Sequence, residues 1–64
     1  MTTAENIALI GESEPSQFRP MVARAERESI AEEHDEYEGY AMHDYIFPDK
    51  SKLRVCAGHM EAIS

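Results

Sequence analysis

The feature that most constrains the fold of this chain is its single cysteine, Cys56, in a sequence of 64 residues. A chain of this length buries about 60% of its unfolded surface, so a hydrophobic core alone stabilises it only marginally. Small natural domains often add disulfides, a metal ion or a partner subunit. One cysteine cannot form an internal disulfide. The sequence therefore predicts one disulfide-free domain over residues 1–64, in a reducing compartment, whose stability depends on self-association (a homodimer, for example) or on a partner.

The net charge of −7 limits the partners of this protein. Nucleic-acid phosphates and anionic membranes both attract positively charged surfaces, so we expect no direct binding to nucleic acid and none to a membrane. A protein partner should instead present a basic surface. The first six residues contain no basic segment, and the apolar run at residues 7–10 is too short for a signal peptide or a membrane span. We therefore expect a cytoplasmic protein.

Residues 3–10 suit a short helix. Thr3 can cap its start, Glu5 lies in the first turn where the helix dipole favours an acid, and Gly11 can end it. The sequence therefore predicts a helix over about residues 3–10, followed by a turn-rich connector.

Residues 20–37 carry the strongest helical pattern in the chain. Pro20 suits the first helical position, and good helix formers follow it. Gly39 marks the expected end. The sequence therefore predicts a second helix over about residues 20–37.

Residues 40–57 look like a β-hairpin around Pro48, which suits the start of a type I turn. Alternation predicts one face with Tyr45, Phe47, Leu53 and Val55 and the other with Asp44, Lys52 and Arg54. The stretch 59–64 is either a third short strand or a frayed end. The predicted fold class is α+β: one or two helices packed on an antiparallel hairpin, which a third strand or a second copy would complete.

The acidic run over residues 26–38 holds seven carboxylates against one base, Arg27. On a helix, Glu28–Glu32 and Glu32–Glu36 would be like-charge pairs at i,i+4, each costing about 0.2–0.5 kcal/mol. A sequence selected for helix stability alone would not place them there, so this conflict is where we expect function. A solvated helix face is the simpler alternative.

The functional interpretation is a negative stripe that docks on a basic groove. Carboxylates about 5–6 Å apart on a helix face imitate a row of phosphates, and nearby aromatic side chains would anchor the complex. The predicted partner-binding residues are Glu28, Glu32, Glu33, Asp35, Glu36, Glu38, Tyr37 and Tyr40.

Signals for catalysis, cofactors or metal are weak in this sequence. His43, Cys56 and His59 include one C-x-x-H pair, whereas a structural zinc site needs four ligands, and His34 would supply the fourth only through the fold. There is no Gly-rich phosphate loop and no nucleophile elbow, and a chain of this size cannot enclose a substrate pocket of about 300 Å³ or more without a partner. We therefore expect no enzyme, and assign no catalytic residue, metal ligand or cofactor.

Residues 45–55 resemble the aromatic–Asp–Gly–Ser–aliphatic hairpins of small phage and plasmid accessory proteins, with Lys50 where those hairpins usually carry glycine. The overall profile, tiny and acidic with helix and hairpin, is similar to phage-encoded inhibitors of host defence, including anti-CRISPR and anti-restriction proteins. The resemblance carries no residue roles.

The expected function is therefore an inhibitor or adaptor that binds a basic-surfaced protein, one that otherwise binds nucleic acid. Two alternatives stay open: a homo-oligomeric structural or assembly subunit that buries the hairpin, and a small metal-binding module.

Overall fold

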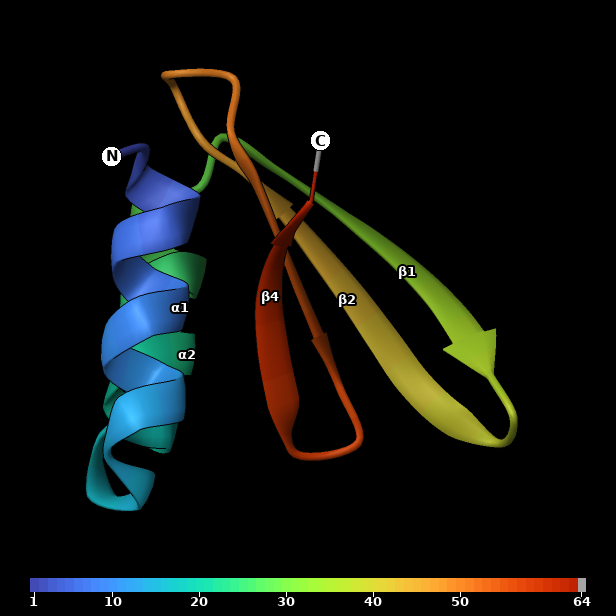
Figure 1. Cartoon of the computed structure of the whole chain (residues 1–64). Helices are drawn as coiled ribbons and strands as arrows, with labels where there is room; N and C mark the ends of the chain where they lie inside the picture. The colour runs from blue at the N-terminus through green and yellow to red at the C-terminus, as the bar shows by residue number, and fades with distance from the viewer. Residues whose placement is uncertain (64) are drawn as a thin grey trace.

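The computed structural model describes residues 1–63 and shows an α+β fold (Figure 1). The elements are α1 (Thr3–Ser13), a short 3-10 turn η1 (Pro15–Gln17), α2 (Phe18–Glu28), β1 (Ala31–Tyr37), β2 (Tyr40–Ile46), β3 (Lys52–Cys56) and β4 (His59–Ile63). The strands form one four-stranded antiparallel sheet in the order β1-β2-β3-β4. The predicted α+β class is confirmed. β2 and β3 are the expected hairpin and β4 is the third strand, whose predicted last residue, Ser64, lies outside the described residues.

The predicted helix over residues 20–37 is wrong in its second half. α2 ends at Glu28, and Ser29 already has an extended backbone. The residues that follow form β1, which pairs with β2 in a continuous antiparallel register. This pairing satisfies the backbone groups of β1 on one side and overrides helix propensity, which is a weak preference. It also extends the backbone to about 3.3 Å per residue, so residues at i,i+4 such as Glu32 and Glu36 lie about 13 Å apart along the strand, and the repulsion expected on a helix is largely removed.

The start of α1 is capped one residue earlier than predicted, by Thr2 and not by Thr3. The Thr2 hydroxyl accepts a hydrogen bond from the Glu5 N–H at 3.1 Å, and the Glu5 carboxylate accepts one from the Thr2 N–H at 2.8 Å. The latter bond lowers the pKa of Glu5. At the other end, the helix continues past Gly11, which does not end it. Gly11 is buried, and a Cβ there would overlap the sulfur of Met60 on β4, so a close helix–strand approach explains this glycine.

The β2–β3 turn is tied to the N-terminus of α1. The Asp49 carboxylate accepts a hydrogen bond from the Thr3 N–H at 2.8 Å, and the Ser51 hydroxyl oxygen accepts one from the Ala4 N–H at 3.1 Å. Together with the capping box, these bonds satisfy the N–H groups that the first turn of a helix leaves without partners. The Ser51 hydroxyl, and then the Thr3 and Ser51 N–H groups, hold the pKa of Asp49 well below its usual range.

Left-handed backbone marks the three turns of the sheet. Lys50 has φ of 72°, and its N–H donates to the Phe47 carbonyl at 2.8 Å across the turn that Pro48 begins; a left-handed residue after a type I turn is common in such hairpins. Glu38 and Gly39 have φ of 51° and 85°, and Ala57 and Gly58 have φ of 52° and 79°. Two consecutive left-handed residues are typical of the type I′ turn. Gly39 therefore closes a hairpin and does not end a helix.

The core lies between the helices and one face of the sheet, which we call the inner face. Its buried apolar residues are Ala4, Ile7, Ala25, Tyr45, Phe47, Leu53 and Met60. The predicted faces of the hairpin are confirmed, because Tyr45 and Leu53 are register partners in this core and Val55 packs against it, whereas Asp44 and Arg54 pair on the opposite, outer face.

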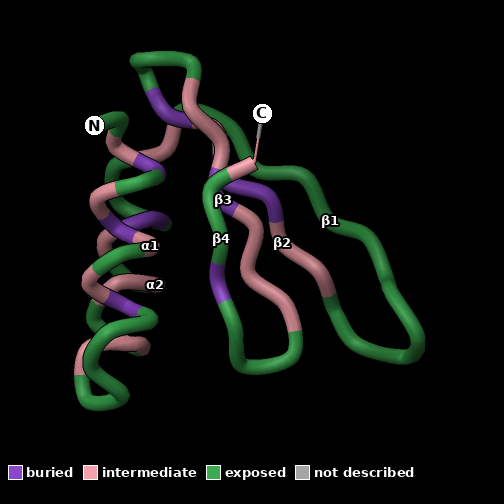
Figure 2. Tube along the Cα trace, viewed as in Figure 1, coloured by how far each residue is buried: buried purple, intermediate pink, exposed green. Residues whose placement is uncertain are grey.

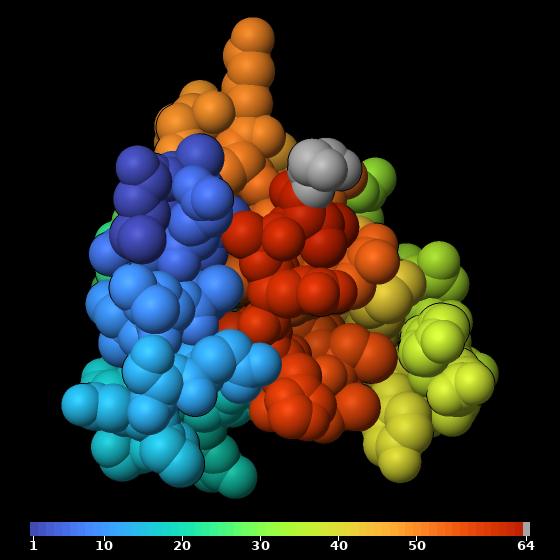
Figure 3. Space-filling view, viewed as in Figure 1, coloured from blue at the N-terminus to red at the C-terminus, as the bar shows by residue number. Residues whose placement is uncertain are grey.

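The helices cover only part of the sheet. α1 packs on β4 and β3, and the buried positions in Figure 2 lie on the helices, β3, β4, one end of β2 and the adjoining β2–β3 loop, while β1 is exposed along its whole length. In the space-filling view, β3 and β4 lie between the helices and the β1–β2 hairpin (Figure 3). Within residues 1–63, no helix has the length and apolar character needed to cross a membrane.

Candidate functional site

β1 is the most accessible regular element of the molecule. All seven of its residues are exposed. It lies at an edge of the sheet and, within residues 1–63, has one neighbouring strand, β2, so one row of its backbone N–H and C=O groups has no strand beside it there. Proteins usually protect such an edge with charged side chains, and β1 carries four carboxylates: Glu32, Glu33, Asp35 and Glu36.

The structure does not gather the predicted partner-binding residues into one stripe. Glu28 closes α2, and its carboxylate pairs with Arg24 at 2.7 Å. The register distributes the other predicted residues over both faces of the hairpin: Glu32 and Glu36 on the inner face, Glu33, Asp35, Tyr37 and Tyr40 on the outer face, and Glu38 in the turn. The predicted carboxylate stripe on a helix is therefore wrong, because alternation in a strand separates residues that a helix would stack.

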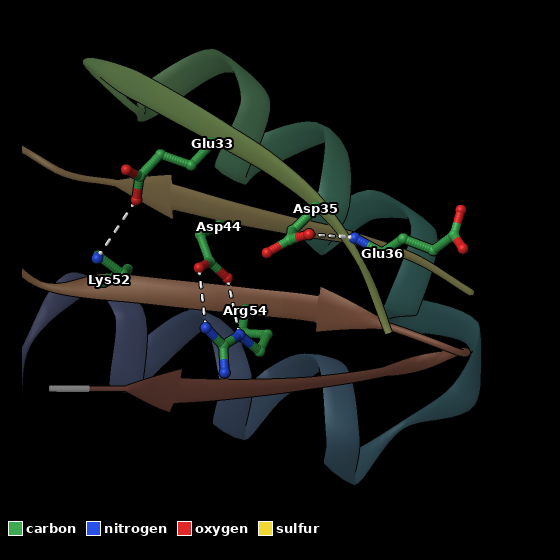
Figure 4. A network of polar contacts seen from close by, with 6 residues as sticks. All are labelled: Glu33, Asp35, Glu36, Asp44, Lys52 and Arg54. Atoms are coloured by element: carbon green, nitrogen blue, oxygen red, sulfur yellow. Dashed lines mark hydrogen bonds and ion pairs between the residues drawn. The ribbon is translucent and has the colours of Figure 1, made fainter. Parts of the chain in front are cut away.

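Two carboxylates on the outer face are neutralised by bases on β3 (Figure 4). Arg54 Nε and Nη2 donate to the two Asp44 carboxylate oxygens at 2.9 and 3.0 Å, and Lys52 Nζ lies 3.4 Å from Glu33 Oε1. The hydrogen bonds that Arg54 donates to the Asp44 carboxylate raise the pKa of Arg54. This half of the outer face is therefore close to neutral.

The far end of the hairpin carries charge without such compensation. Among residues 1–63, no base lies within ion-pair distance of Asp35, Glu36 or Glu38; the one bond to Asp35 comes from the Glu36 N–H at 2.7 Å. Tyr37 and Tyr40 are register partners beside these acids, 60% and 57% exposed. We call these five residues the acidic tip. It contains five of the eight predicted binding residues, which the β1–β2 hairpin brings together in place of the predicted helix.

An open groove adjoins the acidic tip on the outer face. Its volume is about 460 Å³, and its lining residues are Tyr37, Met42, Arg54, Cys56, Ala57 and Glu61. A side chain of a partner that reached this groove would pass the exposed ring of Tyr37.

The inner face of the hairpin brings together two histidines and a carboxylate that the sequence analysis did not group. Glu32 Oε2 lies 2.9 Å from His34 Nε2 and 3.0 Å from His43 Nδ1. The C-x-x-H pair considered in the sequence behaves differently, because Cys56 and His59 are register partners on the outer face. Cys56, His59 and His43 therefore cannot share one metal ion.

The sequence contains a signal for the group of Glu32, His34 and His43 if residues 31–46 are read as a hairpin. His34 and His43 each lie four residues from the nearer turn residue, Glu38 or Gly39, and a two-residue turn places them opposite each other. Glu32 precedes His34 by two positions and so shares its face. The helical interpretation of residues 20–37 hid this signal.

Comparisons of the chain with protein families, with curated proteins and with solved structures give no match.

Proposed function

We propose that this protein is a cytoplasmic inhibitor or adaptor that binds a larger, basic-surfaced protein through the acidic tip. The target class that fits best is a protein that otherwise binds nucleic acid, because its surface already selects negative charge. The observation that supports this proposal is the composition of the tip: three carboxylates without basic partners among residues 1–63 lie beside two half-exposed tyrosines, one at the end of β1 and one at the start of β2.

The parts of the tip have different energetic roles in this proposal. The carboxylates speed encounter with a positive surface and select against acidic partners, but they contribute little affinity because salt and water screen them. Tyr37 and Tyr40 supply apolar area and a hydroxyl each, as anchoring residues of interfaces commonly do. The free edge of β1 offers main-chain hydrogen bonds to an extended segment of the partner.

The alternative of a homo-oligomer that pairs β1 with β1 of a second copy has an electrostatic cost. Such a pairing would bring the carboxylates of two acidic strands together, and like charges directly opposite each other destabilise a sheet. A basic partner strand would instead meet complementary charge. The exposed acids on β1 thus favour a different protein as the partner of this edge.

Quantitative affinity capture from host lysate, at low and high salt, tests the proposal. The test variant is Glu36→Lys with Glu38→Lys, whose side chains make no ion pair among the described residues. The control is Glu14→Lys with Glu26→Lys, which changes the net charge equally at two exposed positions outside the acidic tip, the C-cap of α1 and the last part of α2.

We expect a nucleic-acid-binding protein that the wild type and the control capture at low salt and that the tip variant loses. Association of the purified partner with the tip variant should be slower by about tenfold or more. If both variants lost the captured partner equally, net charge alone would explain the binding. Capture that does not weaken with added salt would contradict the proposal. A chain that captures nothing and sediments as an oligomer would favour the homo-oligomeric alternative instead.

A further inference from the structure

The inner face of the β1–β2 hairpin holds three metal-ligating side chains in one group. Glu32 Oε2 lies 2.9 Å from His34 Nε2 and 3.0 Å from His43 Nδ1, and the three ligand atoms all lie within 4.8 Å of one another. The two rings meet edge to face with centroids 4.7 Å apart. One carboxylate oxygen therefore lies between two imidazole nitrogens.

The fold fixes this arrangement through three independent features. The register places His34 directly opposite His43, and alternation along β1 puts Glu32 on the same face. The His43 ring stacks on Tyr45, with centroids 6.3 Å apart and an interplanar angle of 18°. Tyr45 belongs to the core and is 3% exposed, so the group is connected to the packed interior although it lies beyond the helices.

We propose that Glu32, His34 and His43 form a binding site for one divalent transition-metal ion, with zinc as the best fit. Two imidazoles and one carboxylate suit zinc and its neighbours, whereas magnesium and calcium prefer a complete set of oxygen ligands. Ligands about 2.0–2.1 Å from a tetrahedral zinc ion lie roughly 3.4 Å from each other, so the two Glu32 distances need to lengthen by about 0.4–0.5 Å. Rotation of exposed side chains supplies such a change.

Three protein ligands leave a fourth tetrahedral position open. His34 is the most exposed of the three, with 64% of its side chain accessible, so that position faces solvent. A water molecule can occupy it, and so can a donor atom from a bound partner. The ion would also link the exposed strand β1 to β2 through their side chains. This proposal does not depend on the function proposed for the acidic tip, since the tip residues are not ligands.

Calorimetric titration of the purified chain with zinc chloride tests the proposal, together with the absorption spectrum of its cobalt(II) complex. We expect one ion per chain and a cobalt spectrum of tetrahedral nitrogen and oxygen ligands. His34→Gln, His43→Gln and Glu32→Gln should each weaken zinc binding by at least about tenfold, since loss of even an outer-sphere partner commonly costs a factor of 10–100.

The chain provides matched controls for each variant. His59→Gln removes the remaining histidine, which is 80% exposed and lies near Glu12 on another part of the surface, and Glu33→Gln removes the neighbouring carboxylate on the outer face. Both should bind zinc as the wild type does. Absence of one-to-one binding in the wild type would overturn the proposal, as would equal losses in His59→Gln and His34→Gln. A cobalt–thiolate band that disappears in Cys56→Ser would also overturn it, because the ion would then sit at the Cys56–His59 pair. The wild-type spectra decide this even if one of the variants failed to fold.

Discussion

β1 and β3 belong to the same sheet but meet different surroundings. β3 has a strand on each side and α1 on its inner face, and its Leu53 is fully buried. β1 has one neighbouring strand among residues 1–63, and every residue on it is exposed. Both strands are held by the same kind of antiparallel hydrogen-bonded pairing. They differ in burial because the helices cover the part of the sheet that contains β3.

This difference shows how a 64-residue chain can hold both a packed core and an open, charged strand. Apolar burial is concentrated where α1, α2, β3 and β4 meet, and there side-chain shape matters for stability. β1 is held in the sheet by its backbone hydrogen bonds to β2, so the packing of the core does not restrict which side chains it carries. Regions with few buried contacts also open at low free energy.

The largest expected effect on the free energy of unfolding comes from a comparison of two matched isoleucine-to-alanine substitutions. Ile7 on α1 is fully buried, and Ile30 just before β1 is 68% exposed. Ile7→Ala should cost about 2–5 kcal/mol, the range for deleting a buried aliphatic side chain. Ile30→Ala should change the free energy of unfolding by less than about 0.5 kcal/mol. Urea denaturation followed by circular dichroism measures both.

A domain of this size has about 3–10 kcal/mol of total stability, so Ile7→Ala should remove a large part of it. Equal effects of the two substitutions would mean that Ile30 is covered in solution, for example by a second copy. Sedimentation of the wild type would then show a dimer.

Gly11→Val is the next largest change. A Cβ at Gly11 overlaps the sulfur of Met60, so valine would push α1 away from β4. Overpacking of this kind should destabilise the fold by about 1–3 kcal/mol. Ala23→Val, at an exposed position of α2, carries only the helix-propensity cost of about 0.5 kcal/mol. A similar small loss at Gly11 would show that Met60 repacks freely.

Asp49 tests the link between the β2–β3 turn and α1. Its pKa is lowered in the folded state, so its contribution to stability is complete above the unfolded pKa of about 3.9 and is lost as the pH falls from there through the folded value. Asp49→Asn should therefore lower the urea midpoint at neutral pH and flatten its decline below about pH 4. The change should be smaller than that of Gly11→Val, because water screens this exposed carboxylate.

Glu14→Gln is the control for this pH series, since it removes an exposed carboxylate at the other end of α1. Glu5, whose pKa is also lowered, remains in both variants and leaves part of the acid dependence in place. An acid profile of Asp49→Asn identical to that of the wild type would mean that the turn is not held to α1 in solution.

The sequence predicted the covered part of the fold better than the bare part. Residues 40–57 alternate apolar and polar side chains because one face of that hairpin is buried, and this alternation revealed its strands and faces. Residues 31–37 face solvent on both sides, so no apolar alternation marks them, and their glutamates favour a helix locally.

The same reason explains which site residues were predicted. Tyr37, Tyr40 and the acids of the tip were found by composition, which does not depend on the fold. The group of Glu32, His34 and His43 depends on the register across the Glu38–Gly39 turn, and it became visible only once residues 31–37 were placed in a strand.

The smallest expected effect comes from glycine substitutions in two turns, one beside the core and one at the end of the β1–β2 hairpin. Lys50 and Glu38 are both left-handed, with φ of 72° and 51°. A left-handed residue other than glycine costs about 1–2 kcal/mol, and glycine loses about 0.5–1 kcal/mol more conformational entropy on folding, so glycine should give a net gain of about 0.5–1 kcal/mol at either position.

Where that gain appears should depend on the region. The Lys50 turn is tied to α1, so Lys50→Gly should raise the global free energy of unfolding and slow the slowest amide exchange in the core, including that of Leu53. Glu38→Gly should protect amides near the tip of the β1–β2 hairpin while leaving the slowest core amides unchanged, if that tip opens by itself. Hydrogen exchange measured residue by residue distinguishes the two results. An equal gain in core protection from both substitutions would show that the bare hairpin unfolds together with the core, and the contrast between β1 and β3 would then concern exposure alone and not local stability.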